Sequence, residues 1–134
     1  MIKMKNRRRS ILIAENDRAC AQWLKLHLER AGFGVFVAYD GEQAAILVAR
    51  QRFELVIANL DLPIINGIEL LRHIRDELGL TEIPVAICVG NDVDSELENL
   101  ADDDNYIRVF QKPVDPSAVV DFAQEAVEYL VSSH

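Results

Sequence analysis

Residues 53–67 have the sequence FELVIANLDLPIING, in which a continuous hydrophobic run leads into a polar loop. An uninterrupted apolar run of this length is typical of a parallel strand that is covered on both faces. Pro63 and the Asn66-Gly67 pair predict a turn before the next element. In parallel α/β sheets the functional groups lie at the carboxyl ends of the strands, so Asn59 is the first residue to inspect.

Short apolar runs and amphipathic stretches alternate along the rest of the chain. We predict strands at residues 11–14, 35–38, 55–58, 84–89 and 106–110, and helices at residues 17–31, 41–48, 67–78, 93–100 and 115–130. Asp17 and Asp115 are suited to cap two of these helices, and Pro116 suits the first helical position. Five strand–helix pairs predict one doubly wound α/β domain, with a parallel sheet and helices on both of its faces.

The charge and composition of the chain limit which ligands and which cellular location are expected for it. The 134 residues carry 14 basic and 22 acidic side chains, and the net charge of −8 argues against nucleic-acid binding by the domain itself. No apolar run is long enough to cross a membrane, and the apolar surroundings of Cys20 and Cys88 predict buried thiols, so the expected location is the cytoplasm. We divide the chain into a basic N-terminal tail at residues 1–9 and one domain at residues 10–131, and we expect no output domain.

Distinctive residues stand at the ends of four of the predicted strands. They are Glu15, Asn16 and Asp17 after the first strand, Asn59 and Asp61 at the third with Pro63 and Gly67 beyond, Val89 at the fourth, and Lys112 and Pro113 after the fifth. In order and spacing these residues resemble the receiver domain of bacterial response regulators, over about residues 10–131. The resemblance implies a CheY-like, flavodoxin-like fold, with a five-stranded sheet in the order 2-1-3-4-5 and five helices.

The same resemblance implies that the phosphorylation site is altered. Asn59 stands at the position of the phosphoacceptor aspartate, and a carboxamide is a poor nucleophile at neutral pH. Asn16 stands at the position of a metal-binding carboxylate, so Glu15 remains as the acidic ligand and Asp61 offers its backbone carbonyl. Because Mg²⁺ prefers several oxygen ligands that include carboxylates, we expect Mg²⁺ binding to be weak or absent.

Two further family positions are altered, and two are retained. Val89 replaces the hydroxyl residue that bonds the phosphoryl group, and Val109 replaces the aromatic residue that serves as a rotameric switch. Lys112 and Pro113 keep the Lys-Pro pair, which implies a cis peptide bond between them. Together these changes imply a pseudo-receiver that has no catalytic residues and is not an enzyme.

The altered residues also predict a polar network that needs no metal. Two carboxylates ~4 Å apart repel by about 4 kcal/mol at an effective dielectric constant near 20, and amides at Asn16 and Asn59 remove much of this repulsion. Lys112 is then expected to pair with Glu15 and to donate a hydrogen bond to the Asn59 carbonyl oxygen.

The sequence is compatible with several functions. The leading hypothesis is a binding module of two-component (phosphorelay) signalling, whose partner is a sensor histidine kinase, another signalling protein or a second copy of the chain. The alternative is a working phosphorelay receiver that uses Asp61 or Asp17 as a displaced acceptor. A small phosphatase or a flavodoxin-like enzyme is less favoured, because no glycine-rich phosphate loop follows the first strand.

Two other features are given structural roles. Trp23 is expected to pack against the rest of the domain, and residues 102–104, three consecutive aspartates, are expected to form a solvated acidic loop.

Overall fold

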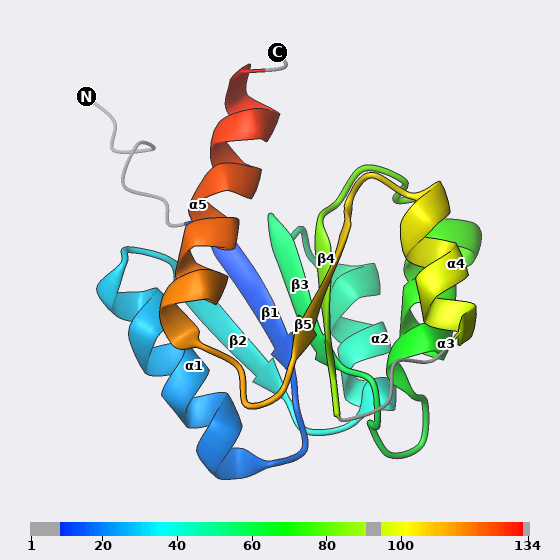
Figure 1. The fold of residues 1–134 in the computed structure, drawn as a ribbon, viewed down its shortest axis with the longest axis horizontal. Helices are drawn as coiled ribbons and strands as arrows, with labels where there is room; N and C mark the ends of the chain where they lie inside the picture. Colours follow the sequence, from blue (N-terminus) through cyan, green and yellow to red (C-terminus); the bar gives the residue numbers. More distant parts are fainter. Residues whose placement is uncertain (1–8, 91–94, 133–134) are drawn as a thin grey trace.

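The structure of the chain, a computed structural model, describes residues 9–90 and 95–132, and for residues 128–132 it describes the backbone alone. Five parallel strands form one sheet in the order β2-β1-β3-β4-β5 (Figure 1). The strands are β1 (Ser10–Ala14), β2 (Gly34–Ala38), β3 (Leu55–Asn59), β4 (Val85–Val89) and β5 (Ile107–Gln111). The helices are α1 (Arg18–Arg30), α2 (Gly41–Arg50), α3 (Gly67–Arg72), the π-helix η2 (His73–Glu77), α4 (Ser95–Asp103) and α5 (Pro116–Ser132). The predicted fold class and strand order are confirmed.

Helices cover both faces of the sheet (Figure 1). α1 and α5 lie on one face, and α2, α3 and α4 lie on the other. Along β1, Ile11 and Ile13 pack with the α1–α5 side, and Leu12 and Ala14 pack with the other side. Because β1, β3 and β4 are buried on both faces, their sequences are continuous apolar runs rather than alternating ones. Full burial of a Leu or Ile side chain stabilises the fold by about 1.5–3 kcal/mol, so these strands hold the site rigidly.

Side-chain caps begin three of the helices at the carboxyl end of the sheet. Asp17 and Asp40 each accept a hydrogen bond from the backbone N–H three residues later, at 3.1 and 2.8 Å. Asn66 and Glu69 form a reciprocal capping box at the start of α3. These caps fix the turns that surround the ends of the strands.

The third helix departs from the prediction of one regular helix over residues 67–78. α3 continues directly as η2, in which the Leu78 amide donates to the His73 carbonyl at 2.9 Å. Arg75, within η2, reaches Asp104 with an Nε–Oδ2 distance of 2.6 Å. Apolar periodicity does not reveal this wider turn, because the side chain that Arg75 meets lies 29 residues further along the chain.

Two predicted side-chain roles are wrong. Residues 102–104 do not form a solvated loop: Asp102 and Asp103 are exposed but belong to the last turn of α4. Asp104 pairs with Arg75 and also accepts a hydrogen bond from the Tyr106 amide at 2.8 Å. Trp23 does not pack into the domain: it is 54% exposed on α1, in edge-to-face contact with His27 at a centroid separation of 4.5 Å. Both errors concern contacts that depend on neighbouring elements rather than on local sequence.

Parts of the predicted organisation lie outside the described residues. These parts are the basic tail at residues 1–9, apart from Arg9, and Val93 of the predicted fourth helix. Within the described part of the chain, no helix combines the length and the hydropathy needed to traverse a bilayer.

Candidate functional site

The carboxyl ends of the strands bring three polar side chains together. Glu15 follows β1, Asn59 is the last residue of β3, and Lys112 follows β5. Glu15 and Asn59 are 3% and 6% exposed, and they are the buried polar residues of the described chain. Because a buried polar group is costly unless it is hydrogen-bonded, the partners of these two residues define the site.

The Asn59 carboxamide is bonded at both of its ends. Its Nδ2 donates to Glu15 Oε2 at 3.1 Å and to Asn16 Oδ1 at 2.9 Å. Its Oδ1 accepts from Lys112 Nζ at 2.9 Å and from the Asp61 amide at 3.3 Å. With two donor and two acceptor contacts, the hydrogen-bonding capacity of the side chain is fully used.

These partners also fix which way the Asn59 amide points. A flipped amide would place its oxygen against the Glu15 carboxylate and its NH₂ group against the Lys112 ammonium. Both contacts would be repulsive, since a carboxylate only accepts and an ammonium only donates hydrogen bonds. The orientation therefore follows from the two charged neighbours.

Glu15 is the buried charge at the centre of the network. Its Oε2 also accepts from the Asp17 amide at 3.0 Å, and its Oε1 lies 3.5 Å from Lys112 Nζ. The predicted Glu15–Lys112 pair and the predicted hydrogen bond from Lys112 to Asn59 are both confirmed. The Lys112-Pro113 peptide bond is cis, also as predicted.

The other predicted site residues surround this network. The Asp61 side chain is exposed, and only its backbone amide contacts Asn59. Asp17 uses its carboxylate to cap α1. Val89 is fully buried, and Val109 is half-buried against the apolar cluster on the α2–α4 side of the sheet, so neither brings a polar group to the site.

Two cysteines lie next to the network, although the sequence predicts only that their thiols are buried. Burial and, after it, the neighbouring Glu15 carboxylate together raise the pKa of Cys20 to about 11. Burial and then Glu15 raise the pKa of Cys88 to about 12. Cys88 is buried as predicted, whereas Cys20 is only partly buried. Both thiols remain protonated at neutral pH, so they are poor nucleophiles. No sequence motif marks their position, because α1 and β4 meet at Glu15 only in the folded chain.

The donor set of the site does not fit Mg²⁺. A hard cation requires several oxygen ligands around one point, usually with more than one carboxylate. Here the Asn59 NH₂ group lies between Glu15 Oε2 and Asn16 Oδ1, so N–H donors are directed at the oxygens that a cation would join. Within residues 9–90 and 95–132, no three His, Cys, Asp or Glu side chains are grouped so that they could hold a metal ion.

Gly67 packs directly against the backbone of the site. A Cβ atom at this position would lie 2.8 Å from the backbone carbonyl oxygen of Asn59 and 2.9 Å from Leu60 Cα. We expect Gly67→Ala to lower the free energy of unfolding by about 1–2 kcal/mol, because backbone atoms cannot yield as a flexible side chain does. Urea denaturation measures the loss. An unchanged midpoint would mean that this loop adjusts without cost.

Comparisons with known proteins agree with the geometry. The family model for the response regulator receiver domain matches residues 11–124. The DNA-binding response regulator MtrA of Mycobacterium bovis is 35% identical over 121 residues, which cover 87% of this chain and 50% of that protein. Response regulator GtcR of Aneurinibacillus migulanus is 32% identical over 88 residues, which cover 66% of this chain and 35% of that protein. The chain thus spans about a third to a half of the length of these curated relatives.

Solved structures show the same fold. A CheY-like receiver domain protein from Methanospirillum hungatei superposes with a TM-score of 0.85 at 21% identity, covering 96% of this chain and 100% of that one. Chemotaxis protein CheY4 of Vibrio cholerae gives a TM-score of 0.77 at 19% identity, covering 90% and 99%. The family model extends over most of the described domain, from β1 into α5. The chain therefore belongs to the family of response regulator receiver domains, the signalling modules of two-component systems.

Proposed function

We propose that this receiver domain signals through protein–protein contact and is not switched by phosphorylation, with Asn59 standing at the phosphoacceptor position. The observation that carries the proposal is the state of the Asn59 amide, which is bonded to Glu15 and Asn16 through nitrogen and to Lys112 through oxygen. The NH₂ group donates to the Glu15 and Asn16 oxygens, which are the oxygens that a cation would need as ligands. Asn59 Oδ1 accepts a hydrogen bond from Lys112, whose ammonium group would otherwise be available to a phosphoryl group.

The chemistry of phosphoryl transfer supports this proposal. The reaction needs a positioned nucleophile and cationic groups that neutralise the developing charge. A carboxamide is not such a nucleophile, and Lys112 is already engaged by Glu15 and Asn59. Val109, at the switch position, has no aromatic ring that could change its rotamer with the state of the pocket. The conformation of the domain is then set by its partner, which shifts the population between states.

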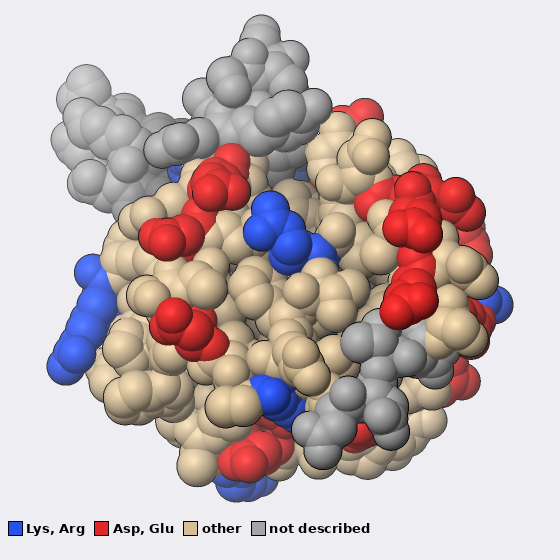
Figure 2. Space-filling view, in the orientation of Figure 1, with Lys and Arg blue, Asp and Glu red and all other residues tan. Residues whose placement is uncertain are grey.

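The partner is a protein of the same signalling class, a histidine kinase or another component of the relay. The chain acts by binding rather than by catalysis. On the face drawn in Figure 2, acidic side chains cover more of the surface than basic ones. The net charge of −8 disfavours direct contact of the domain with DNA, so a role in transcription would operate through that partner.

Incubation with acetyl phosphate and Mg²⁺ tests the proposal. We expect the intact mass of the protein to remain unchanged, because the pocket lacks the nucleophile and has an amide, Asn16, in place of a metal-binding carboxylate. A receiver domain that carries the acceptor aspartate, treated in parallel, controls for the reagent. We also expect millimolar Mg²⁺ to leave the melting temperature within about 1 °C, since a ligand that does not bind the native state does not stabilise it.

A phosphoryl adduct on the wild-type chain would contradict the proposal. Asp61→Ala and Asp17→Ala, treated in the same way, would then locate the displaced acceptor. A rise of several degrees in the melting temperature with Mg²⁺ would show instead that the pocket still binds the metal.

A further inference from the structure

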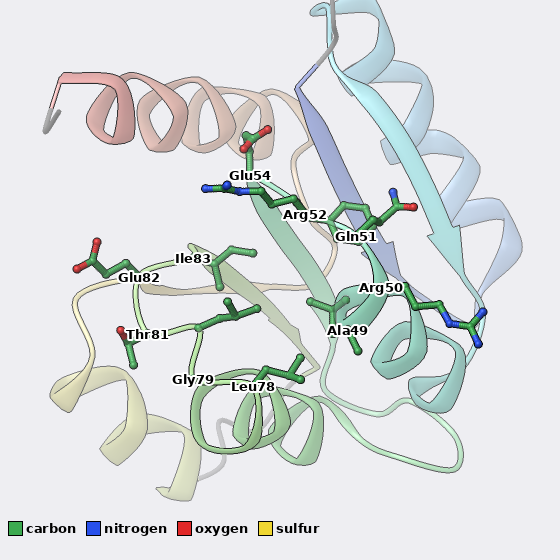
Figure 3. Close-up of a pocket in the computed structure, with 13 residues that line it drawn as sticks. Ala49, Arg50, Gln51, Arg52, Glu54, Leu78, Gly79, Thr81, Glu82 and Ile83 are labelled. Carbon is green, nitrogen blue, oxygen red and sulfur yellow. The ribbon is translucent and has the colours of Figure 1, made fainter.

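A hollow lies at the end of the sheet opposite to Asn59. It has a volume of about 600 Å³ and lies between the loop that joins α2 to β3 and the segment that joins η2 to β4 (Figure 3). We call it the loop groove. Its apolar lining includes Val48, Phe53, Leu78 and Ile83. An apolar groove of this size on the surface is typical of a binding site.

Opposite charges stand on the two sides of the loop groove. Arg52 belongs to the α2–β3 loop, and Glu82 belongs to the segment before β4 (Figure 3). Among the described residues, neither side chain forms an ion pair or a hydrogen bond. With Arg50 and Glu54, the lining carries two positive and two negative charges, although the chain as a whole carries −8. A purely anionic or purely cationic ligand would therefore meet repulsion as well as attraction.

Leu80 is an exposed apolar residue in the lining of the loop groove. It is 38% exposed. Its amide donates to the Ile74 carbonyl at 3.0 Å, and its own carbonyl accepts from Arg75 Nη1 at 2.8 Å. Gly79 precedes it with φ of +69°, a conformation that lets the chain turn sharply at this point. Because the backbone of Leu80 is already held by these two hydrogen bonds, covering its side chain costs little backbone entropy.

We propose that the loop groove is the contact between two copies of this chain, related by a two-fold axis. Leu80 of each copy enters the groove of the other, and Arg52 of each copy faces Glu82 of the other. A two-fold axis requires a surface that is complementary to itself. A groove with an exposed leucine, one side that is net positive through Arg50, Arg52 and Glu54, and an opposite side that carries Glu82 meets this requirement. The contact lies away from the Asn59 network, so it does not depend on the function proposed above.

The size of the loop groove limits the strength of this contact. Stable interfaces bury roughly 800 Å² on each partner, and a single groove with one inserted leucine provides less. We therefore expect a weak, reversible dimer with a Kd of about 0.1 mM. Such a dimer forms at high local concentration, for example where two partner-bound copies are held close together.

Sedimentation velocity of the full chain, from micromolar concentrations to about 1 mM, tests this proposal at concentrations that span the expected Kd. We expect Arg52→Glu and Glu82→Arg each to raise the Kd by about tenfold or more, because the two-fold axis applies each change twice. The double variant Arg52→Glu/Glu82→Arg exchanges the charges and should return the Kd to within about threefold of wild type. Leu80→Asp should leave a monomer at all concentrations.

Glu42→Lys is the matched control. Glu42 is exposed at the other end of α2, so a change in net charge there that equals the change in Glu82→Arg should not alter the Kd. Circular dichroism confirms that each variant is folded. A wild-type monomer at 1 mM, single reversals that act no more strongly than Glu42→Lys, or a double reversal that stays as weak as the single ones would each overturn the proposal.

Discussion

Lys112→Met is expected to lower the free energy of unfolding by about 3 kcal/mol, the largest single effect in the pocket. The substitution keeps most of the aliphatic side chain and removes the ammonium group. It leaves the Glu15 carboxylate, whose side chain is 5% exposed, without its cation. It also leaves Asn59 Oδ1 without its 2.9 Å donor. We place the loss at the low end of the range for buried pairs because the lysine side chain is itself 33% exposed.

A double-mutant cycle with Glu15→Gln separates the charge pair from packing. Glu15→Gln removes the buried charge, so Lys112→Met should cost about 1–2 kcal/mol less in that background than in wild type. Lys25→Met is the matched control, since Lys25 lies 3.5 Å from Glu29 in a more exposed helix pair. Equal costs for Lys112→Met in both backgrounds would show that the lysine contributes through its aliphatic contacts alone.

Asn59→Asp is expected to lower the free energy of unfolding by about 2–3 kcal/mol in metal-free buffer at neutral pH. The change removes both hydrogen bonds that Nδ2 donates, each worth about 1 kcal/mol. It also places a second carboxylate beside Glu15, and the contact with Lys112 offsets only part of the repulsion. Urea denaturation in the presence of a chelator measures the loss.

Asn66→Asp is the matched control for this variant. Asn66 caps α3 through its Oδ1, and aspartate caps a helix equally well, so the same chemical change should be nearly neutral there. An Asn59→Asp protein as stable as wild type in chelator would contradict the role given to the NH₂ group.

Phosphorylation of the Asn59→Asp variant tests whether Asn59 alone, or Asn59 together with Asn16, prevents the chain from accepting a phosphoryl group. We expect this single variant to take up little phosphoryl group from acetyl phosphate, because Asn16 still supplies an amide where the metal needs a carboxylate. Rapid phosphorylation with Mg²⁺ would show that Asn59 alone separates this chain from a working receiver.

Several features of the site follow from sequence patterns. The uninterrupted apolar run before Asn59 predicts a strand buried on both faces, because only that environment tolerates it. The identities of Glu15, Asn59 and Lys112 at strand ends predict one network, because the carboxyl ends of parallel strands share an edge of the sheet. The chemistry of an ammonium, a carboxylate and an amide leaves one favourable pairing, which the structure contains.

Other features depend on contacts that no local pattern encodes. The π-helix η2 forms where Arg75 meets Asp104, and the exposed position of Trp23 follows from how α1 sits on the sheet. The loop groove arises because the α2–β3 loop and the η2–β4 segment lead into neighbouring strands at the same edge of the sheet.

The sequence by itself determined the fold, its strand order through the resemblance to receivers, and the residue types at the pocket, because burial and periodicity act locally along the chain. Only the tertiary structure decided that the Asn59 amide is bonded at both ends, that two thiols lie beside Glu15 and that a charged groove opens at the far end of the sheet. Each of these depends on side chains tens of residues apart, whose separation in space is set by packing rather than by spacing in the sequence.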